Sequence, residues 1–182
     1  MNKVQFFWNS LKHIKTRGTV APTSKFTCQH IVSHINFDQT RVVVELGAGE
    51  GCITKHLLSH LRADARLFCF EIDQMLCKQL LRINDPRLII IQDSAEHLDH
   101  YLHLHGVEAV DAIVSGIPFI VLPNDLRTTI LGQAKAALRP GGRFIQFHYS
   151  PRPKKRYEEW FDEVNVGFEV RNIPPAFVFV CV

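Results

Sequence analysis

The sequence predicts an α/β fold in which a mostly parallel sheet of seven strands, one of them antiparallel, is covered by helices on both faces. Between residues 42 and 164, short apolar runs rich in β-branched residues alternate with segments of helical periodicity. This alternation is typical of buried parallel strands joined by crossover helices. No helix separates the last two apolar runs, so we expect them to form an antiparallel hairpin. A chain of 182 residues that is 46% apolar has the size and composition of one such domain.

Each strand is predicted from a run dominated by Val, Ile, Leu, Phe or Cys. The expected strands are residues 42–46, 67–71, 88–91, 109–114, 144–149, 168–170 and 177–180. Helices are expected after the glycine-rich segment 47–51, after Asp73, from Ser94 to about residue 104, over residues 124–138 and over residues 158–164. Asp73 and Ser94 are residue types that cap helix N-termini. Pro140-Gly141-Gly142 is a strong signal for the end of a helix, and residues 151–155 are expected to form a loop.

The composition excludes several classes of protein. No apolar run reaches the ~18 residues of a membrane-spanning helix. The first residues have no apolar segment of a secretory signal, so we expect a cytoplasmic protein. The net charge of +3 permits an anionic partner but is far from the basic stripe of a dedicated nucleic-acid-binding protein. The five cysteines include no C-x-x-C pair and the ten histidines are scattered, so we expect reduced thiols and no metal site.

The glycine-rich segment after the first strand predicts a ligand-binding loop. Glu45 precedes Gly47-Ala48-Gly49-Glu50-Gly51, where glycines allow a tight turn and a close approach of the backbone to a ligand. Dinucleotide sites use G-x-G-x-x-G, whereas this loop has G-x-G-x-G and carries acids. Acids repel a pyrophosphate and attract an ammonium group. S-adenosylmethionine has an α-ammonium, a sulfonium and no phosphate, so the loop favours this methyl donor over NAD.

Two acids follow the next strands and extend the predicted donor site. Glu71 comes about twenty residues after the glycines, at the place where such folds bind a ribose diol. Asp93 follows the third strand, where it can accept from an adenine amino group or simply cap the helix that begins at Ser94. Ser115 ends the fourth strand and borders the same crevice. The candidate donor-binding residues are therefore Glu45, Gly47, Gly49, Glu71, Ile72, Asp93, Ser94 and Ser115.

The acceptor is expected beside the ends of the fourth and fifth strands. Ser115-Gly116-Ile117-Pro118-Phe119 borders the transferable methyl, and Phe119 either packs against the acceptor or covers the edge of the sheet. Tyr149, at the end of the fifth strand, is the candidate catalytic residue because its ring face or hydroxyl can reach the crevice. The alternative is that Tyr149 packs under the last hairpin.

The first residues have the spacing of an amphipathic helix. Its predicted apolar face carries Val4, Phe7, Trp8, Leu11 and Ile14, and the flanking cations are Lys3, Lys12, Lys15 and Arg17. Such a helix is typical of a membrane-surface element, with packing on its own domain as the alternative. We therefore divide the chain into a helix and lid segment over residues 1–36 and a donor-binding domain over residues 37–182. The basic cluster in residues 152–156 is expected to be a solvated loop rather than a phosphate contact.

These segments resemble the bacterial phospholipid N-methyltransferases, which are S-adenosylmethionine-dependent enzymes with a Rossmann-like class I fold. The resemblance runs nearly end to end. It rests on residues 18–24 (Gly-Thr-Val-Ala-Pro-Thr-Ser), 44–51, 115–119 and 139–150. The chain departs from that pattern at His148, where a small hydroxyl residue is expected, and at Thr23, where serine is commoner. The same region is similar to ribosomal RNA adenine dimethylases, but Ser115 replaces the amide that begins their Asn-Pro-Pro-aromatic motif.

The resemblance implies methyl transfer to the amine of phosphatidylethanolamine and of its monomethyl and dimethyl forms. In that reaction Tyr149, with Phe119, would face the growing cation, and Arg17, Lys25 or Arg127 would hold the phosphate. The predicted membrane-binding residues are Phe7, Trp8, Leu11, Lys12 and Lys15. We expect a monomer on the inner face of the cytoplasmic membrane, with a lipid substrate and no nucleic acid or metal. The alternatives are methylation of an ornithine lipid, methylation of RNA adenine, and a membrane-bound regulator that binds the donor without catalysis.

Overall fold

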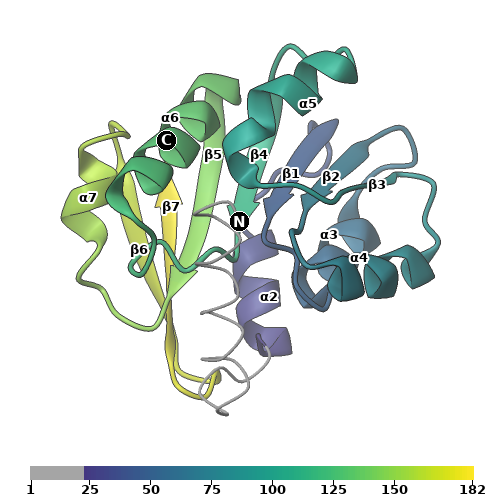
Figure 1. The fold of residues 1–182 in the computed structure, drawn as a ribbon. Coiled ribbons are helices and arrows are strands. Elements are labelled where there is room, and N and C mark those ends of the chain that lie inside the picture. Colours follow the sequence, from purple (N-terminus) through teal and green to yellow (C-terminus); the bar gives the residue numbers. More distant parts are fainter. Residues whose placement is uncertain (1–22) are drawn as a thin grey trace.

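The computed structural model describes residues 23–182, which form one seven-stranded sheet in the order β3-β2-β1-β4-β5-β7-β6 (Figure 1). Among these strands β7 runs in the direction opposite to the other six, so its pairings with β5 and β6 are antiparallel and the remaining pairings are parallel. The predicted fold class and the antiparallel hairpin at the end of the chain are therefore confirmed. The predictions made for Phe7, Trp8, Leu11, Lys12, Lys15 and Arg17 lie outside the described residues.

The observed elements follow the predicted order. The strands are β1 (Val42–Leu46), β2 (Arg66–Phe70), β3 (Leu88–Ile91), β4 (Val110–Ser115), β5 (Leu138–His148), β6 (Val164–Glu169) and β7 (Ala176–Cys181). The α-helices are α2 (Lys25–Val32), α3 (Cys52–His60), α4 (Gln74–Leu80), α5 (Leu98–Leu104), α6 (Asn124–Ala137) and α7 (Lys154–Glu158). The short 3-10 helices η1 (Leu81–Ile83) and η2 (Ala95–His97) follow α4 and precede α5.

Two predicted helix caps are confirmed. The Asp73 carboxylate accepts from the backbone N–H groups of Met75 and Leu76, at 2.7 and 3.4 Å, and so begins α4. The Ser94 hydroxyl oxygen accepts from the N–H of Glu96 at 3.4 Å and begins η2. Both side chains satisfy backbone donors that the first turn of a helix leaves without partners.

Two boundaries differ from the prediction. The fifth strand begins at Leu138, directly after α6, because Leu138 pairs with Val110 before an irregularity that ends where Arg143 pairs with Ala112. The segment Pro140-Gly141-Gly142 therefore lies within β5, where Gly141 adopts a φ of +73°. The short helix predicted over residues 158–164 is instead α7, which ends at Glu158, because residues 164–169 pair with β7 as an edge strand.

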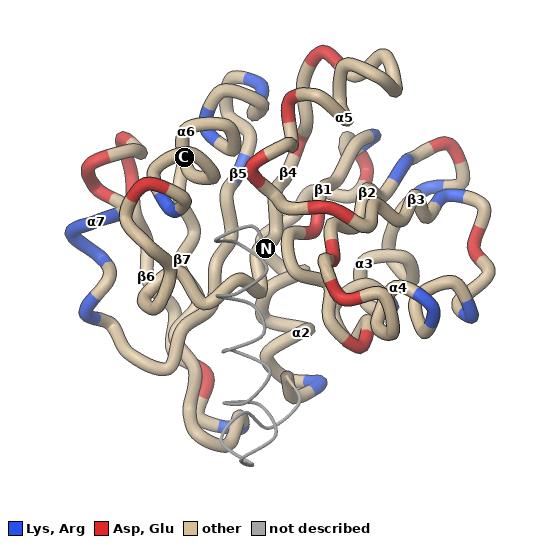
Figure 2. The backbone as a smooth tube through the Cα atoms, in the orientation of Figure 1, with Lys and Arg blue, Asp and Glu red and all other residues tan. Residues whose placement is uncertain are grey.

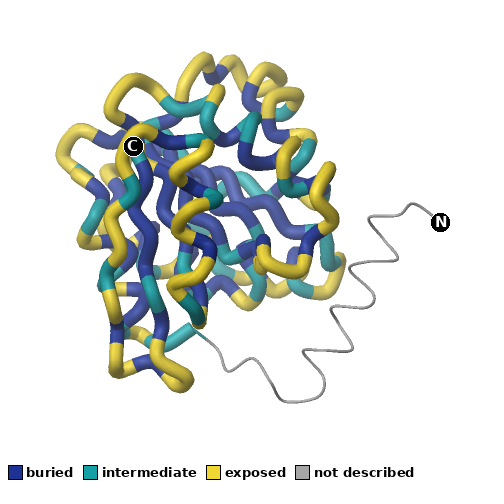
Figure 3. The backbone as a smooth tube through the Cα atoms, turned by 90° about the vertical axis from the view of Figure 1, so that its left-hand side faces the viewer, coloured by how far each residue is buried: buried dark blue, intermediate teal, exposed yellow. Residues whose placement is uncertain are grey.

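Alternate residues of each strand pack into one of two apolar layers. Val44 and Phe68 join the layer of α5, α6 and α7, whereas Val43 and Leu67 join the layer of α2, α3 and α4. The central sheet is consequently buried between exposed helices, as the dark blue strands show in Figure 3. Since helices cover both faces of the sheet, a ligand can approach the strands at their ends, either the amino ends or the carboxyl ends.

The register of the sheet aligns the carboxyl ends of its parallel strands. Leu46 of β1 pairs with Phe70 of β2 and Ser115 of β4, Phe70 pairs with Ile91 of β3, and Ser115 pairs with Gln146 of β5. The residues that follow these positions lie along one edge, which we call the carboxyl edge. The turn between β6 and β7 lies at this edge as well, because β5 and β7 pair as far as His148 and Phe177.

The chain crosses itself closely at the carboxyl edge between β1 and β4. The N–H of Gly116 donates to the carbonyl oxygen of Leu46 at 2.8 Å. A Cβ placed on Gly116 would lie 2.9 Å from the carbonyl oxygen of Gly47, which is closer than real Cβ contacts allow. Backbone on both sides leaves no flexible group to move aside.

We expect Gly116→Ala to lower the free energy of unfolding by about 1–3 kcal/mol, because the added methyl overpacks two backbone segments. The control is Gly132→Ala within α6, whose Cβ would meet Trp160 at an ordinary 3.4 Å. This control should keep or raise stability by up to ~1 kcal/mol. Urea denaturation measures both, and equal stabilities of the two variants would contradict the close approach.

Candidate functional site

The glycine loop at the carboxyl edge is fastened to β2 and leaves one face open. Gly47, Gly49 and Gly51 all have positive φ, at +74°, +57° and +80°, which glycine adopts without strain. The N–H groups of Gly47 and Ala48 donate to the carbonyl oxygen of Phe70, at 2.8 and 3.2 Å. No atom lies within 4 Å of the Cβ position of Gly49. The loop thus presents bare backbone in a fixed shape.

The Glu71 carboxylate joins this loop to the start of α4. Oε2 accepts from the N–H of Gly49 and Oε1 from the N–H of Asp73, both at 2.9 Å. The residue is buried, so the two N–H groups fix the carboxylate in one orientation. Each carboxylate oxygen has a further lone pair, which can accept from a hydroxyl group of a ligand.

Glu45 lies beneath the loop rather than on its surface. Its Oε2 accepts from the Thr54 hydroxyl at 2.6 Å and from the Cys69 thiol at 3.1 Å, between β1, β2 and α3. Its Oε1 is buried and has no hydrogen-bond partner. Burial raises the pKa of Glu45 to about 7, which the two hydrogen bonds only partly offset. This acid is therefore poised between its neutral and charged forms near neutral pH.

Asp93 occupies the end of β3 and has several donors. Its Oδ1 accepts from the N–H of Ser94 at 2.7 Å and lies 3.1 Å from Nδ1 of His97, and its Oδ2 accepts from the Tyr101 hydroxyl at 3.0 Å. Burial opposes ionisation, but these hydrogen bonds outweigh it and lower the pKa of Asp93. Sequence reasoning missed Tyr101, which lies on α5 and reaches Asp93 only through the fold.

Ser115 and Gln146 are buried side by side at the ends of β4 and β5. The Ser115 hydroxyl oxygen accepts from the N–H of Ile117 at 3.2 Å and so shapes the turn after β4. The Gln146 amide donates to the carbonyl oxygens of Ile117 and Phe147, at 3.0 and 2.9 Å, while its Oε1 has no partner. Gln146 is the second polar residue that the sequence did not single out as a site residue.

Phe119 lies in the core and does not face a crevice. Its side chain is 1% exposed, and its ring meets that of Phe144 edge to face at 6.2 Å. Of the two roles expected for Phe119, covering the sheet is the one that the structure shows, and contact with an acceptor is not. The short apolar turn after Ser115 directs the ring inward because α6 must pack over this end of β4 and β5.

Tyr149 lies at the carboxyl edge, one residue past β5, and is partly exposed. Its ring meets Phe147 edge to face at 6.1 Å, and its hydroxyl interacts with Asn172 in the turn after β6. Burial raises the pKa of the Tyr149 hydroxyl, so the phenol stays protonated at neutral pH. The neighbouring His148 points to the opposite face, at 2.7 Å from the Tyr157 hydroxyl, and burial lowers the pKa of His148 to about 4.

Two of the alternative anion-binding cations, Arg127 and Lys25, lie in the described part of the chain, in different helical layers. Arg127 lies on α6, where it donates to the carbonyl oxygen of Phe119 at 3.4 Å and to Asn124. Burial, and then the charge of Arg156, lower the pKa of Arg127. Lys25 begins α2 in the other helical layer, with its Nζ 5.2 Å from the centre of the Phe26 ring. Arg127 and Lys25 therefore approach the carboxyl edge from opposite faces of the sheet.

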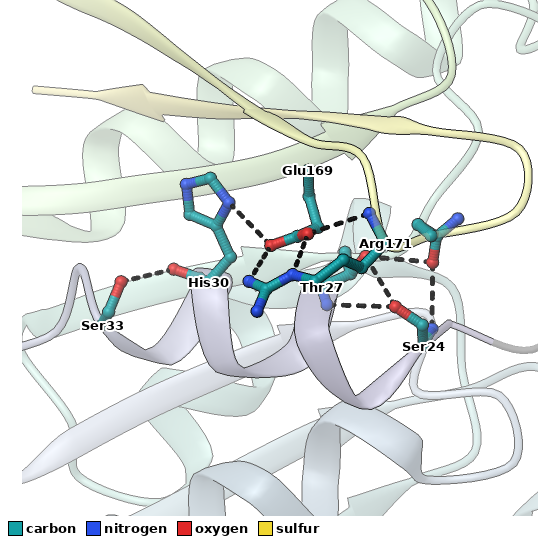
Figure 4. Close-up of polar contacts among 7 residues, drawn as sticks. Ser24, Thr27, His30, Ser33, Glu169 and Arg171 are labelled. Carbon is teal, nitrogen blue, oxygen red and sulfur yellow. Dashed lines mark hydrogen bonds and ion pairs between the residues drawn. The ribbon is translucent and has the colours of Figure 1, made fainter.

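A polar cluster that the sequence did not predict joins the start of α2 to the β6–β7 turn (Figure 4). The Asn172 Oδ1 accepts from the N–H of Ser24 at 3.0 Å and from the Thr27 hydroxyl at 2.9 Å. On the same turn, Arg171 donates to both oxygens of Glu169, at 2.7 and 2.8 Å. These contacts fasten the segment that contains Ser24 to the carboxyl edge.

Neither a metal centre nor a spanning helix occurs in the described part of the chain. Residues 23–182 contain no group of three or more His, Cys, Asp or Glu residues placed to hold a metal ion. Among the same residues, no helix combines the length and the apolar character needed to cross a bilayer.

The sheet order, the glycine loop and the acids after β2 and β3 define a Rossmann-like methyltransferase that uses S-adenosylmethionine. A family model described as Ribosomal RNA adenine dimethylase matches residues 22–115, just over half of the chain. A protein of Singulisphaera acidiphila named ornithine lipid N-methyltransferase is 33% identical over 179 residues, which are 97% of this chain and 93% of that protein. Both matches show that the chain belongs to the S-adenosylmethionine-dependent methyltransferases, in the family that includes the ornithine lipid enzyme and matches the rRNA adenine dimethylase model.

Solved structures agree with the fold. An rRNA methylase of Streptococcus thermophilus superposes with a TM-score of 0.63 at 16% identity, covering 88% of this chain and 98% of that one. A toxoflavin-precursor N1-methyltransferase of Burkholderia thailandensis, with S-adenosylhomocysteine bound, superposes with a TM-score of 0.67 at 17% identity, covering 85% and 75%. At these identities the likeness establishes the fold, and the acceptor has to be argued from this chain's own residues.

The buried Glu45 generates a prediction about stability and pH. Its pKa in the fold lies above the ordinary value of 4.5, so the protonated form stabilises the fold. That stabilisation is complete below pH ~4.5 and is lost as the pH rises through about 7. In the unaltered protein this loss lowers the free energy of unfolding by about 3 kcal/mol. We expect no such loss in Glu45→Gln, because glutamine cannot ionise.

Urea denaturation of both proteins at pH 5 and pH 8 measures the difference. The free energy of unfolding of the unaltered protein, relative to Glu45→Gln, should fall between the two pH values. A relative stability that stays constant would show that Glu45 ionises normally in the fold.

Proposed function

We propose that this methyltransferase transfers methyl groups to the amine of a membrane aminolipid. The observation that carries the proposal is the extent of the two sequence matches. The rRNA dimethylase family model ends at Ser115, so it covers the half of the chain that contains the donor loop. The match to the ornithine lipid enzyme continues through 97% of the chain and includes β5, β6, β7 and the loops around Tyr149. The half of the chain after Ser115, where the acceptor would bind, is therefore matched by a lipid enzyme and not by the rRNA dimethylase model.

The residues at the carboxyl edge fit the donor. The open face of Gly49 gives room for close contact, Glu71 offers two oriented oxygens to ribose hydroxyls, and Asp93 offers oxygens to the adenine amino group. Gly47, Ile72, Ser94 and Ser115 would line the same edge, and the unpartnered oxygen of Glu45 adds negative charge beneath it. When bound, S-adenosylmethionine supplies an electrophilic methyl group on a sulfonium cation. The acidic groups around the site would stabilise this cation.

The acceptor needs a neutral amine rather than a strong base. An alkyl ammonium has a pKa of about 10.4, and desolvation beside a cationic donor lowers it. Tyr149 stays protonated, so we assign its partly exposed ring and hydroxyl the tasks of orienting the nitrogen and stabilising its growing positive charge. Arg127 or Lys25, and Arg17 in the undescribed segment, remain candidates to bind the anionic group of the lipid.

Two head groups satisfy this chemistry. Phosphatidylethanolamine offers a primary amine near a phosphate, and an ornithine lipid offers a primary amine near a carboxylate. The sequence resemblance favours ethanolamine, whereas the 33% identical relative is named for ornithine lipids, and we give that relative more weight. In either case the enzyme would work on the inner face of the membrane as a peripheral protein, with Phe7, Trp8, Leu11, Lys12 and Lys15 in its membrane-binding helix.

Methylation of RNA adenine is the second candidate function, because the matching family model is named for it. That function needs a basic groove with stacking aromatic residues for RNA. The net charge of +3 and the burial of Phe119 offer little of either. Unlabelled ribosomal RNA therefore belongs in the assay as a competing acceptor.

Glu71→Ala should weaken S-adenosylmethionine binding by about tenfold or more, because it removes a charged acceptor for the ribose and releases the Gly49 N–H. Isothermal titration calorimetry measures the affinity. Glu108→Ala is the matched control, since Glu108 is an exposed glutamate just before β4, at the opposite edge of the sheet. Unchanged affinity in Glu71→Ala would remove Glu71 from the donor site.

Incubation with methyl-labelled S-adenosylmethionine tests the acceptor. We expect label in the amine of ornithine lipid or phosphatidylethanolamine when each is supplied in mixed micelles, and none in ribosomal RNA. Tyr149→Phe, which keeps the ring, should retain more activity than Tyr149→Ala. Label in RNA and not in either lipid would overturn the proposed function.

A further inference from the structure

We propose that the carboxyl edge of the β4–β7 half is a second membrane-contact surface, which seats on an anionic bilayer through the β6–β7 turn. This inference rests on the proposed lipid acceptor and gives the surface through which that lipid would reach the donor. Exposed large apolar side chains gather in the loops that leave the carboxyl ends of β4, β5 and β6. These side chains are Ile120, Val121, Tyr149, Val170 and Ile173.

The β6–β7 turn has its polarity reversed. Asn172 is 2% exposed and Glu169 is buried, whereas Val170 is 62% exposed and Ile173 is 82% exposed. In a water-facing turn the polar side chains lie outside and the apolar ones inside. The turn buries Glu169 and Asn172 and exposes Val170, Ile173 and the Arg171 guanidinium, which suits a partner that is both apolar and anionic.

The turn is also held rigidly, so its apolar side chains keep their outward position. Asn172 binds the start of α2 through Ser24 and Thr27, and its amide donates to the carbonyl oxygen of Pro174 at 2.6 Å. Figure 4 shows the contacts of Ser24 and Thr27 together with the Glu169–Arg171 pair, in which the Arg171 side chain is 59% exposed. Apolar groups fixed in this way lose little conformational entropy when they enter a membrane.

Charge identifies the partner as an anionic bilayer. The carboxyl edge is acidic around β1, β2 and β3, where the cationic donor would bind, with Glu50, Glu71, Asp73 and Asp93. Around the apolar loops, on α2, α6, α7 and the β6–β7 turn, cations outnumber acids: Lys25, Arg127, Arg152, Lys154, Lys155, Arg156 and Arg171 lie there with Asp125, Glu158, Glu159 and Glu169. In Figure 2 blue segments lie at α7 and at the β6–β7 turn, each with red segments nearby. Apolar side chains flanked by cations are the combination that binds anionic membrane surfaces.

The position of the donor site also requires the carboxyl edge to face the membrane. A head-group nitrogen lies in the interfacial layer of a bilayer, so the edge that carries the donor must come close to that layer. Val170 and Ile173 lie on this edge, beside Tyr149, whose hydroxyl interacts with Asn172 of the same turn. Insertion of the turn would therefore bring Tyr149 to the depth of the head groups.

The first test compares two matched double variants of the full chain. Val170→Ser/Ile173→Ser removes the exposed apolar groups of the turn. Leu81→Ser/Leu104→Ser removes two side chains of similar exposure, 64% and 66%, from the opposite edge of the sheet. In sedimentation with vesicles of equal parts phosphatidylglycerol and phosphatidylcholine, we expect the turn variant to bind about tenfold more weakly and the control to bind normally. Equal binding of the two variants would overturn the proposal.

A second measurement reports insertion independently of overall affinity. Tryptophan is placed at the turn in Ile173→Trp and at the opposite edge in Leu104→Trp, and each is compared with the parent protein. Lipids brominated near the head group should quench the added fluorescence of Ile173→Trp and not that of Leu104→Trp. Absence of quenching at position 173 would overturn the proposal, as would self-association in light scattering that Ile173→Ser abolishes, since the turn would then bind a second copy.

Failure of this proposal is distinguishable from failure of the proposed function. Methyl transfer to lipid in detergent micelles tests the function and does not require a bilayer. A turn variant that keeps micellar activity but loses vesicle binding supports both statements. Vesicle binding through the turn without lipid methylation would leave the surface correct and the acceptor wrong.

Discussion

The candidate site depends on one constraint, the register that places the last residues of the parallel strands in a single row. Leu46, Phe70, Ile91, Ser115 and Gln146 form that row by strand pairing. The backbone then turns away at each end, and the N–H groups of Gly47 and Gly116 bind carbonyl oxygens of the neighbouring chain ends. These backbone hydrogen bonds hold residues that are far apart in sequence together at one edge.

Three carboxyl groups lie at or beneath that edge, and each is stabilised differently. Glu71 is held by two backbone N–H groups, and Asp93 accepts hydrogen bonds from a backbone N–H and a tyrosine hydroxyl. Glu45, in the apolar layer below, has its pKa raised to about 7 by burial and so carries only part of a charge near neutral pH. Hydrogen-bond donors and partial protonation therefore limit the mutual repulsion of the three carboxyl groups.

Sequence patterns predicted what depends on local chemistry. The bounds of β1 and β3 and the Asp73 cap follow from β-branched runs and from the capping propensity of Asp. The fifth strand was predicted from residue 144, but its start at Leu138 was missed, because a local stop signal lies within an irregular part of the strand that only pairing with β4 makes possible. The inward direction of the Phe119 ring and the hydrogen-bond partners of Asn172 depend on contacts between segments that are far apart in the sequence. Ser24 and Asn172, for example, are 148 residues apart, a separation at which no periodicity carries information.

The position of β7 has a consequence for the order in which the enzyme is assembled. β7 is the final strand of the chain, yet it lies between β5 and β6, so β6 has no place in the sheet until residues 176–181 have been made. The strands that carry the glycine loop and its acids are complete by residue 91 and need no later segment for their mutual pairing. The donor half can therefore pair before residues 176–181 have been made, but the acceptor half closes only once those residues are present.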